Sequence, residues 1–290
     1  MKQAYLKLIS SFLLFGSNGI VASHILLTSY EIVFARTLIG SLFLIMIHII
    51  SKGKFRSWEN KKHFCCVIVS GAAMSGSWMF LYEAYKQIGV SLATLAYYCG
   101  PVIVMALSPL VFRERLTKAK ISGLFAVLAG MLFVNGGDLL QGGFSWGLLC
   151  GVMSAFTYAL MVICNKKAVS ITGLENSMWQ LTVSFFAVAV FMLIKQGAAF
   201  PFPLHSILPI LFLGVVNTGI GCYLYFSSIH QLPVQSVAIL GYLEPLSALI
   251  FSAALLQERL SLIQIAGAVL ILGGAAFGEF FSFSRQKGVK

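Results

Sequence analysis

Charged residues are scarce in this sequence. Only 10% of its 290 residues are Asp, Glu, Lys or Arg, whereas 59% are hydrophobic. In a soluble domain about a quarter of the residues are charged, and a surface with so little charge would aggregate in water. In lipid the same composition is favourable, because each exposed polar group there raises the free energy. The composition excludes an ordinary soluble protein and predicts a membrane protein.

Signals of catalysis, cofactor binding and metal binding are also missing. The chain has no HExxH motif, no phosphate-binding P-loop and no Asp-rich phosphate site. Its six cysteines lie within or beside apolar runs and lack metal-ligand or redox spacing. We interpret them as packing residues, with palmitoylation of Cys65 or Cys66 as the alternative. We therefore predict that the protein is no enzyme and holds no cofactor or metal.

Long apolar runs, separated by short polar breaks, fill the chain. A helix needs about 20 apolar residues to cross a membrane, so the runs predict an all-α membrane protein with ten spans. The predicted spans are residues 4–22, 31–50, 64–84, 91–112, 119–135, 146–164, 175–195, 207–227, 234–256 and 262–281.

Basic residues are distributed unevenly among the predicted loops. If the N-terminus is cytoplasmic, 16 of the 20 Lys and Arg residues lie in cytoplasmic segments and three in outer segments. The positive-inside rule then predicts a bacterial inner-membrane protein with both termini in the cytoplasm. The basic excess faces anionic lipid headgroups. We predict no nucleic-acid partner, because no basic patch is interleaved with stacking aromatic residues.

An internal duplication occurs at an offset of 144 residues. It predicts two domains, residues 1–137 and 144–282, with five spans each. Because five is odd, the second copy must run in the opposite direction through the membrane, which gives two inverted five-helix repeats, the architecture of many secondary transporters. The matching positions are Tyr98 and Tyr242, Pro101 and Pro245, Glu114 and Glu258, Gly123 and Gly267, and Gly130 and Gly274.

The duplicated motif resembles a known family. A Pro about thirteen residues before Glu-Arg-Leu, followed by a Gly-rich helix, resembles the EamA-type domain of the drug/metabolite transporter (DMT) superfamily. The sequence FGSN at residues 15–18 and Arg36 in VFARTLIG resemble the first and second helices of that family. The resemblance covers essentially the whole chain. It implies a ten-helix carrier with a central cavity, often an exporter of metabolites or amino acids.

Two ionisable residues lie clearly within the predicted spans, where placing a charge is costly and commonly functional. Glu244 is expected near the membrane midplane, where Pro245 interrupts the helix. It either binds a cationic group or exchanges a proton, or it is a structural carboxyl. Arg36 either pairs with Glu83 or extends to the headgroups, or it recognises an anionic group. Glu114 and Glu258 are interpreted as helix-end residues at the membrane interface.

Polar and aromatic side chains at helical spacing predict a cavity wall. Ser75, Trp78 and Tyr82 share one helix face. Aromatic rings hold apolar or cationic solutes, although Tyr and Trp are also enriched at membrane interfaces. The predicted substrate-binding residues are Asn18, Ser75, Trp78, Tyr82, Tyr98, Tyr158, Tyr225, Tyr242 and Glu244.

These patterns together predict a secondary transporter of small organic solutes, in the lipid bilayer, working by alternating access. A metabolite or amino-acid exporter is favoured; a multidrug or organic-cation exporter and an uptake carrier are the alternatives. A membrane-embedded enzyme on lipid-linked substrates is disfavoured, because the outer loops are nearly uncharged. The Gly-rich faces of the fifth and tenth spans indicate close helix packing within the chain, or a homodimer.

Overall fold

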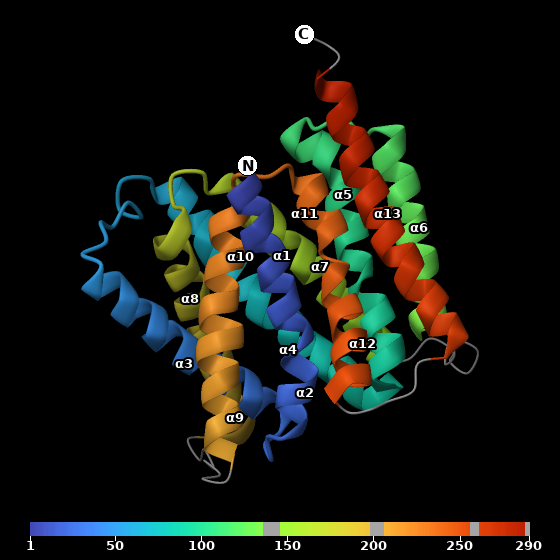
Figure 1. The fold of residues 1–290 in the computed structure, drawn as a ribbon. Helices are drawn as coiled ribbons and strands as arrows, with labels where there is room; N and C mark the ends of the chain where they lie inside the picture. Colours follow the sequence, from blue (N-terminus) through green and yellow to red (C-terminus); the bar gives the residue numbers. More distant parts are fainter. Residues whose placement is uncertain (136–145, 198–205, 256–260, 288–290) are drawn as a thin grey trace.

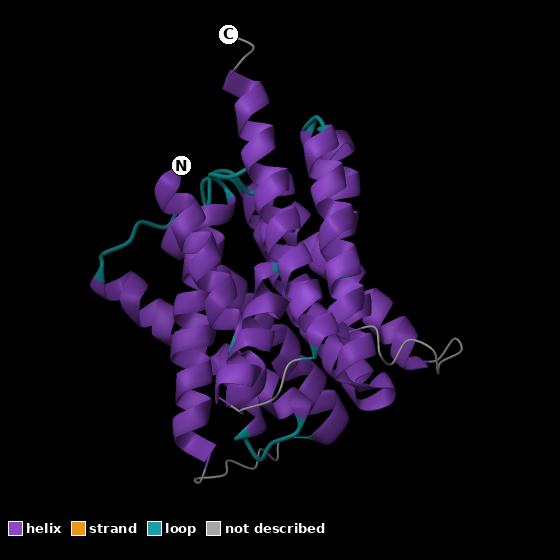
Figure 2. Cartoon of the chain, turned by 45° about the vertical axis from the view of Figure 1, so that its right-hand side comes forward, coloured by secondary structure: helices purple, strands orange, loops and turns teal. Residues whose placement is uncertain are grey.

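The computed structural model of the protein describes residues 1–135, 146–197, 206–255 and 261–287. This part of the chain is helical, with short loops and no strand (Figures 1 and 2). The helices are α1 (Lys2–Gly16), α2 (Asn18–Ser23), α3 (Ser29–Ile50), α4 (Lys61–Tyr97), α5 (Cys99–Phe112), α6 (Lys118–Asn135), α7 (Trp146–Lys167), α8 (Gly173–Gln196), α9 (Ile207–Phe212), a π-helix η3 (Leu213–Ile220), α10 (Gly221–Ile229), α11 (Val234–Leu240), α12 (Leu243–Leu255) and α13 (Leu262–Lys287).

Seven helical stretches are long and apolar enough to cross a membrane, judged by length and composition within the described residues. They coincide with the predicted spans one to three and six to nine. Two shorter apolar helices, Cys99–Phe112 and Leu262–Gly278, coincide with the predicted fourth and tenth spans, and α6 with the fifth. The all-helical prediction is confirmed, whereas ten membrane crossings stay a prediction.

The third and fourth predicted spans do not meet where the sequence analysis placed them. Helix α4 runs unbroken from Lys61 to Tyr97, through the predicted loop between residues 84 and 91. A lone Gly weakens a helix but does not end it. The break falls at Tyr98, three residues before Pro101. Proline is tolerated in the first turn of α5, but its ring clashes with the carbonyl of the residue four positions earlier, here Tyr97.

The ninth predicted span breaks in the same way. Helix α11 ends at Leu240 and α12 begins at Leu243, so Pro245 occupies the first turn of α12. The carbonyl oxygen of Gly241, which Pro245 leaves without its helical donor, accepts the N–H of Glu244 instead, at 3.2 Å. The proline therefore places Glu244 in the first turn of a new helix inside the protein.

Helices from the two predicted repeats pack in a reciprocal pattern. Helix α4 packs on α7, α1 on α10, and α6 on α13, the last two side by side in Figure 1. A Cβ atom on Gly123 would lie 2.6 Å from the carbonyl oxygen of Gly274, and one on Gly130 would lie 2.6 Å from that of Gly267. At the 144-residue offset Gly123 corresponds to Gly267 and Gly130 to Gly274, so the two contacts are equivalent. The Gly-rich faces of α6 and α13 are thus used within the chain.

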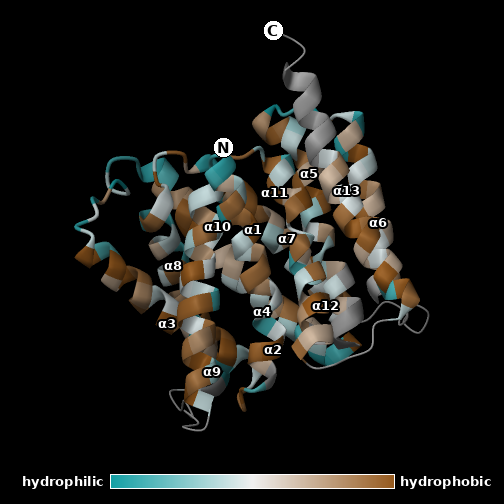
Figure 3. Ribbon diagram, in the orientation of Figure 1, coloured by the Kyte–Doolittle hydropathy of each residue, from teal (hydrophilic) through white to brown (hydrophobic). Residues whose placement is uncertain are grey.

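The outer surface of the bundle is apolar. Leu110, Ile194 and Leu262 are each more than 80% exposed. Figure 3 shows hydrophobic residues along the helices and hydrophilic residues gathered near the N-terminus and in the loop between α3 and α4. A surface of this kind suits lipid and not water. The protein is a multi-pass membrane protein.

Candidate functional site

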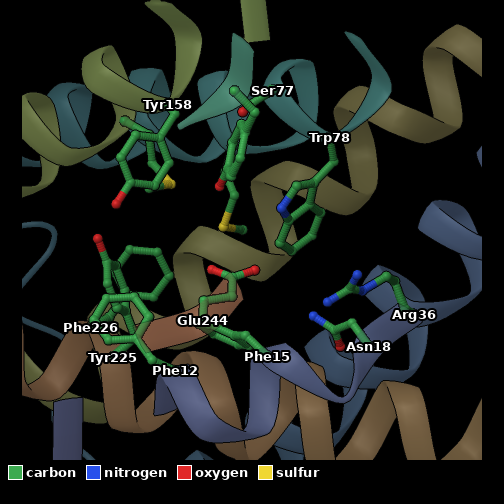
Figure 4. Close-up of a pocket in the computed structure, with 13 residues that line it drawn as sticks. Phe12, Phe15, Asn18, Arg36, Ser77, Trp78, Tyr158, Tyr225, Phe226 and Glu244 are labelled. Atoms are coloured by element: carbon green, nitrogen blue, oxygen red, sulfur yellow. The ribbon is translucent and has the colours of Figure 1, made fainter. Parts of the chain in front are cut away.

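A cavity lies among helices from both predicted repeats (Figure 4). It encloses about 500 Å³ of empty space, its mouth included. Its lining combines two charged side chains, several aromatic rings and a few polar or sulfur-containing groups. The lining residues are Phe12, Phe15, Asn18, Arg36, Met74, Ser77, Trp78, Tyr97, Tyr158, Met161, Tyr225, Phe226 and Glu244.

Glu244 supplies the only carboxylate of this lining. Its position follows from the break between α11 and α12, and in Figure 4 its carboxylate lies between the Tyr158 and Tyr225 side and the Arg36 side of the cavity. The repeat-equivalent residue is Gly100, where an added Cβ would lie 2.7 Å from the Tyr158 ring. At this pair of positions the first predicted repeat therefore packs an aromatic ring where the second has a carboxylate.

Arg36 supplies the only cation of the same lining. Although α3 is a candidate span, the side chain is only 3% exposed, so it does not extend to the headgroups. Its Nε donates to Thr218 Oγ1 at 2.9 Å, and its guanidinium carbon lies 4.3 Å from the centre of the Trp78 ring. Thr218 Oγ1 in turn donates to the Leu213 carbonyl at 2.8 Å, five residues back along the π-helix η3. Short π segments occur frequently at functional sites.

The side chains of Phe12, Tyr158, Tyr225 and Phe226 lie at the end of the cavity away from Arg36 (Figure 4). In Figure 4 the hydroxyl groups of Tyr158 and Tyr225 point toward each other from opposite walls. The ring of Phe12 packs edge-on against Tyr225, with the ring centres 5.8 Å apart. The cavity thus has an aromatic end and a charged end, with Glu244 between them.

Asn18 is held at the charged end by Asn217, which belongs to the other predicted repeat. The Asn217 side-chain nitrogen lies 2.9 Å from Asn18 Oδ1, 2.9 Å from Ser17 Oγ and 3.1 Å from the Leu14 carbonyl. These bonds cross from η3 to the junction of α1 and α2, where the helix is interrupted at Ser17. The FGSN segment is therefore held beside the cavity by a buried amide.

The structure brings several of the predicted site residues together. Asn18, Trp78, Tyr158, Tyr225 and Glu244 line the cavity, and Arg36 joins them. Ser77 and Tyr97 also line the cavity but were not predicted, and neither were the apolar lining residues Phe12, Phe15, Met74, Met161 and Phe226. Nothing in their pattern separates them from ordinary packing residues, except that Phe15 belongs to FGSN and Tyr97 adjoins Tyr98.

Other predicted binding residues lie outside the lining. Ser75 donates to the Ala72 carbonyl of its own helix at 2.9 Å, and Tyr82 packs edge-on against Tyr85. Tyr98 and Tyr242 contact each other, since the Tyr242 hydroxyl donates to the Tyr98 carbonyl at 2.8 Å. These two residues join the broken helices and do not form the cavity wall.

The structure gives the remaining acidic residues other partners. Glu83 accepts a hydrogen bond from the Tyr30 hydroxyl and one from Gln87, and does not make the predicted pair with Arg36. Glu114 accepts the N–H groups of Val234, at 2.8 Å, and Gln235, at 3.3 Å. It therefore caps the first turn of α11. Glu258 lies outside the described residues.

No group of three or more His, Cys, Asp or Glu residues within the described ranges is placed to hold a metal ion. The guanidinium of Arg36, the amide of Asn18 and the indole of Trp78 form the charged end of the cavity, and the carboxylate of Glu244 lies next to it. Such groups bind an organic solute by hydrogen bonds, by charge and by ring contacts.

Comparison with known proteins identifies the family. The sequence pattern of the EamA-like transporter family matches residues 2–136 and again residues 145–278. An uncharacterized transporter of Bacillus subtilis, YxxF, is 26% identical over 283 residues, which cover 94% of this chain and 88% of YxxF. A probable amino-acid metabolite efflux pump of Salmonella typhimurium is 28% identical over 221 residues, 71% of this chain and 73% of the pump.

A solved crystal structure of a protein 18% identical in sequence has the same fold. It superimposes with a TM-score of 0.81 over 96% of this chain and 98% of its own. The fold, the two matched segments and the relatives agree with the resemblance found in the sequence. The chain belongs to the EamA-like transporter family, within the drug/metabolite transporter superfamily.

Proposed function

We propose that this protein is a secondary transporter that exports small organic metabolites, amino acids above all, through the cavity containing Arg36 and Glu244. The observation that carries the proposal is the placement of these two charges. They come from different predicted repeats and line one cavity among apolar helices. Charges are expensive within a membrane and mark substrate pathways there.

Alternating access follows from the predicted symmetry. If the repeats are inverted, rocking one against the other exposes a central site first to one side of the membrane and then to the other. The paired Gly contacts between α6 and α13 support a symmetric arrangement, because exchanging the two predicted repeats turns one contact into the other. The charge distribution favours cytoplasmic termini, and in Figure 1 the N-terminus and the C-terminal end of α13 lie toward the same end of the bundle.

Export of amino acids is favoured by the relatives. The Salmonella typhimurium protein and its Escherichia coli counterpart are both named probable amino-acid metabolite efflux pumps. An organic-cation exporter and an uptake carrier are the second candidates, the former because Glu244 is the lining's only acid and lies near several aromatic rings.

Efflux measurements test the proposal. Cells preloaded with labelled amino acids are compared when they express wild type, Glu244→Gln, the exposed-loop control Glu59→Gln, or an empty vector. We expect faster efflux with wild type and with Glu59→Gln, and vector-like efflux with Glu244→Gln at equal expression. Equal efflux from wild-type and vector cells for every amino acid would remove the support for amino-acid export. Labelled organic cations and uptake assays would then test the second candidates.

A further inference from the structure

Arg36 is fixed in place but keeps unused hydrogen-bonding capacity. Thr218 holds Nε and the Trp78 ring covers the guanidinium. The nitrogen Nη2 is buried and has no hydrogen-bond partner, although the side chain lies on the cavity. A buried donor without an acceptor costs free energy, and more so when it is charged. In Figure 4 the guanidinium points into the cavity, toward Asn18 and Glu244.

Glu244 is also uncommitted. Within the described part of the chain its backbone N–H and carbonyl have partners in Gly241 and Ser247, whereas its carboxylate takes part in no hydrogen bond or ion pair. Arg36 is near enough to act on it electrostatically, but the two groups make no direct ion pair. Among the described residues that line it, the cavity therefore presents an unpartnered guanidinium nitrogen, Arg36 Nη2, and the unpartnered carboxylate of Glu244 to a solute.

The balance of charge selects the kind of solute. An organic anion would pair with Arg36 but be repelled by the carboxylate of Glu244. An organic cation would pair with Glu244 but be repelled by Arg36. A zwitterion complements both. We propose, on the basis of the transport function proposed above, that the cavity binds a zwitterionic α-amino acid, with the solute carboxylate on Arg36 Nη2 and its ammonium group on Glu244.

The apolar end of the cavity sets the preferred side chain. With the ammonium group at Glu244 and the carboxylate toward Arg36, the side chain points to the end lined by Phe12, Tyr158 and Tyr225. These rings favour burial of a large apolar or aromatic group. Small polar amino acids would leave this surface uncovered and bind more weakly.

Thr218 is a positioning residue in this arrangement. Its hydroxyl occupies Nε of Arg36 and leaves Nη2 to the solute. Replacing the hydroxyl by a methyl group would free the guanidinium to rotate without changing the net charge. Thr218→Val should therefore weaken carboxylate recognition, whereas Thr218→Ser, which keeps the acceptor, should not.

Three probes that share one side chain and differ in the charges of the α-amino and carboxyl groups test the assignment on the purified full-length protein. They are L-phenylalanine, its methyl ester, which lacks the carboxylate, and N-acetyl-L-phenylalanine, which lacks the ammonium group. We expect wild type to bind the free amino acid at least about tenfold more tightly than either derivative, because each derivative leaves one buried charge unpaired.

The variants must lose these preferences selectively. Arg36→Gln should abolish the preference over the ester, and Glu244→Gln the preference over the N-acetyl derivative, while the loop variants Arg56→Gln and Glu59→Gln keep both. Arg36→Lys retains the charge and should keep part of the preference over the ester. A monodisperse elution profile identifies folded variants, and Thr218→Val provides a milder test if Arg36→Gln does not fold.

Two results would overturn the zwitterion site. One is a wild type that binds the ester as tightly as the free acid. The other is a pair of folded variants, Arg36→Gln and Glu244→Gln, with unchanged preferences. Transport itself is judged separately in proteoliposomes: movement of tetraphenylphosphonium without movement of amino acids would leave a transporter but remove this site, and movement of no probe of any charge would also contradict the proposed function.

Discussion

The hydroxyl group of Tyr242 donates a 2.8 Å hydrogen bond to the carbonyl oxygen of Tyr98, its equivalent in the other predicted repeat. The ring centres of the two residues are 5.8 Å apart. Each lies at the break that a proline three residues later imposes on its helix. Residues that contact their own equivalents are expected close to the axis of the predicted repeats, and this pair joins the two sets of broken helices.

This hydrogen bond predicts an asymmetric effect of two matched substitutions. Tyr242 is fully buried, so Tyr242→Phe leaves the Tyr98 carbonyl without this donor and should destabilise the protein by about 1–2 kcal/mol. Tyr98→Phe keeps the backbone carbonyl and therefore keeps the bond. Thermal unfolding of both variants in detergent gives the comparison. If both variants lost the same amount of apparent Tm, loss of this hydrogen bond would not explain the destabilisation of Tyr242→Phe.

The contact between α6 and α13 predicts a difference between two adjacent glycines. A Cβ at position 274 would lie 2.7 Å from the Gly123 carbonyl oxygen, whereas one at position 273 would meet nothing within 4 Å. Gly274→Ala should separate the helices and cost at least about 1–3 kcal/mol, as overpacking generally does. Gly273→Ala should be neutral or slightly stabilising, since alanine favours a helix. Folded yield and apparent Tm of the two variants test this, and similar values for both would contradict the predicted packing.

A half-buried histidine outside the spanning segments predicts a pH dependence of stability. Burial, and secondarily the nearby Lys166, lowers the pKa of His230 to about 4, and its Nε2 accepts a hydrogen bond from Asn176. The folded protein thus keeps this imidazole neutral, whereas the unfolded chain takes up a proton near pH 6.5.

The sign follows from the lowered pKa. Stability that is fully present above about pH 6.5 is lost as the pH falls toward 4, by an amount on the order of 2 kcal/mol at pH 5. His230→Gln should be less sensitive to acid than wild type. The measurement is the apparent Tm of both proteins at pH 7.5 and pH 5. Parallel decreases in the two would show that another group is responsible.

Trp78 is expected to contribute to binding through Arg36. The ring covers a buried guanidinium, and such a cation–π contact contributes about 2 kcal/mol when it is desolvated. Trp78→Leu should therefore weaken solute binding roughly tenfold or more. Trp58→Leu is the matched control, because Trp58 is 70% exposed in a loop. If solute binding were equally strong in both variants, Trp78 would not form part of the site.

The lipid solvent explains why the helical membrane fold could be predicted from the sequence. A lipid environment requires long apolar helices, so composition and run length predicted the all-helical membrane protein, and seven runs form helices of spanning length. Proline imposes its break locally, which is why the interruption before Pro245 was predictable. No break was predicted before Pro101, and the loop expected between the third and fourth spans is helical instead, because the glycine and glutamine there do not end a helix.

The residues that line the cavity could not be predicted from the pattern of each helix alone. Trp78 and Tyr82 share a helix face in the sequence, but four residues rise about 6 Å along the axis. At that distance their partners differ: Trp78 reaches Arg36 of α3, whereas Tyr82 packs against Tyr85 of its own helix. Likewise, nothing in the sequence paired Arg36 with Thr218, 182 residues away.

The sequence by itself determined the membrane environment, the duplicated motif and the two charged residues within the spans, because hydropathy, proline geometry and the cost of a charge in lipid act on each residue locally. Only the tertiary structure decided that Arg36 and Glu244 line one cavity without pairing, and that Glu83 and Tyr242 bind elsewhere. Those outcomes depend on how far each helix is rotated and shifted against its neighbours, and this is fixed by the summed packing of the whole bundle.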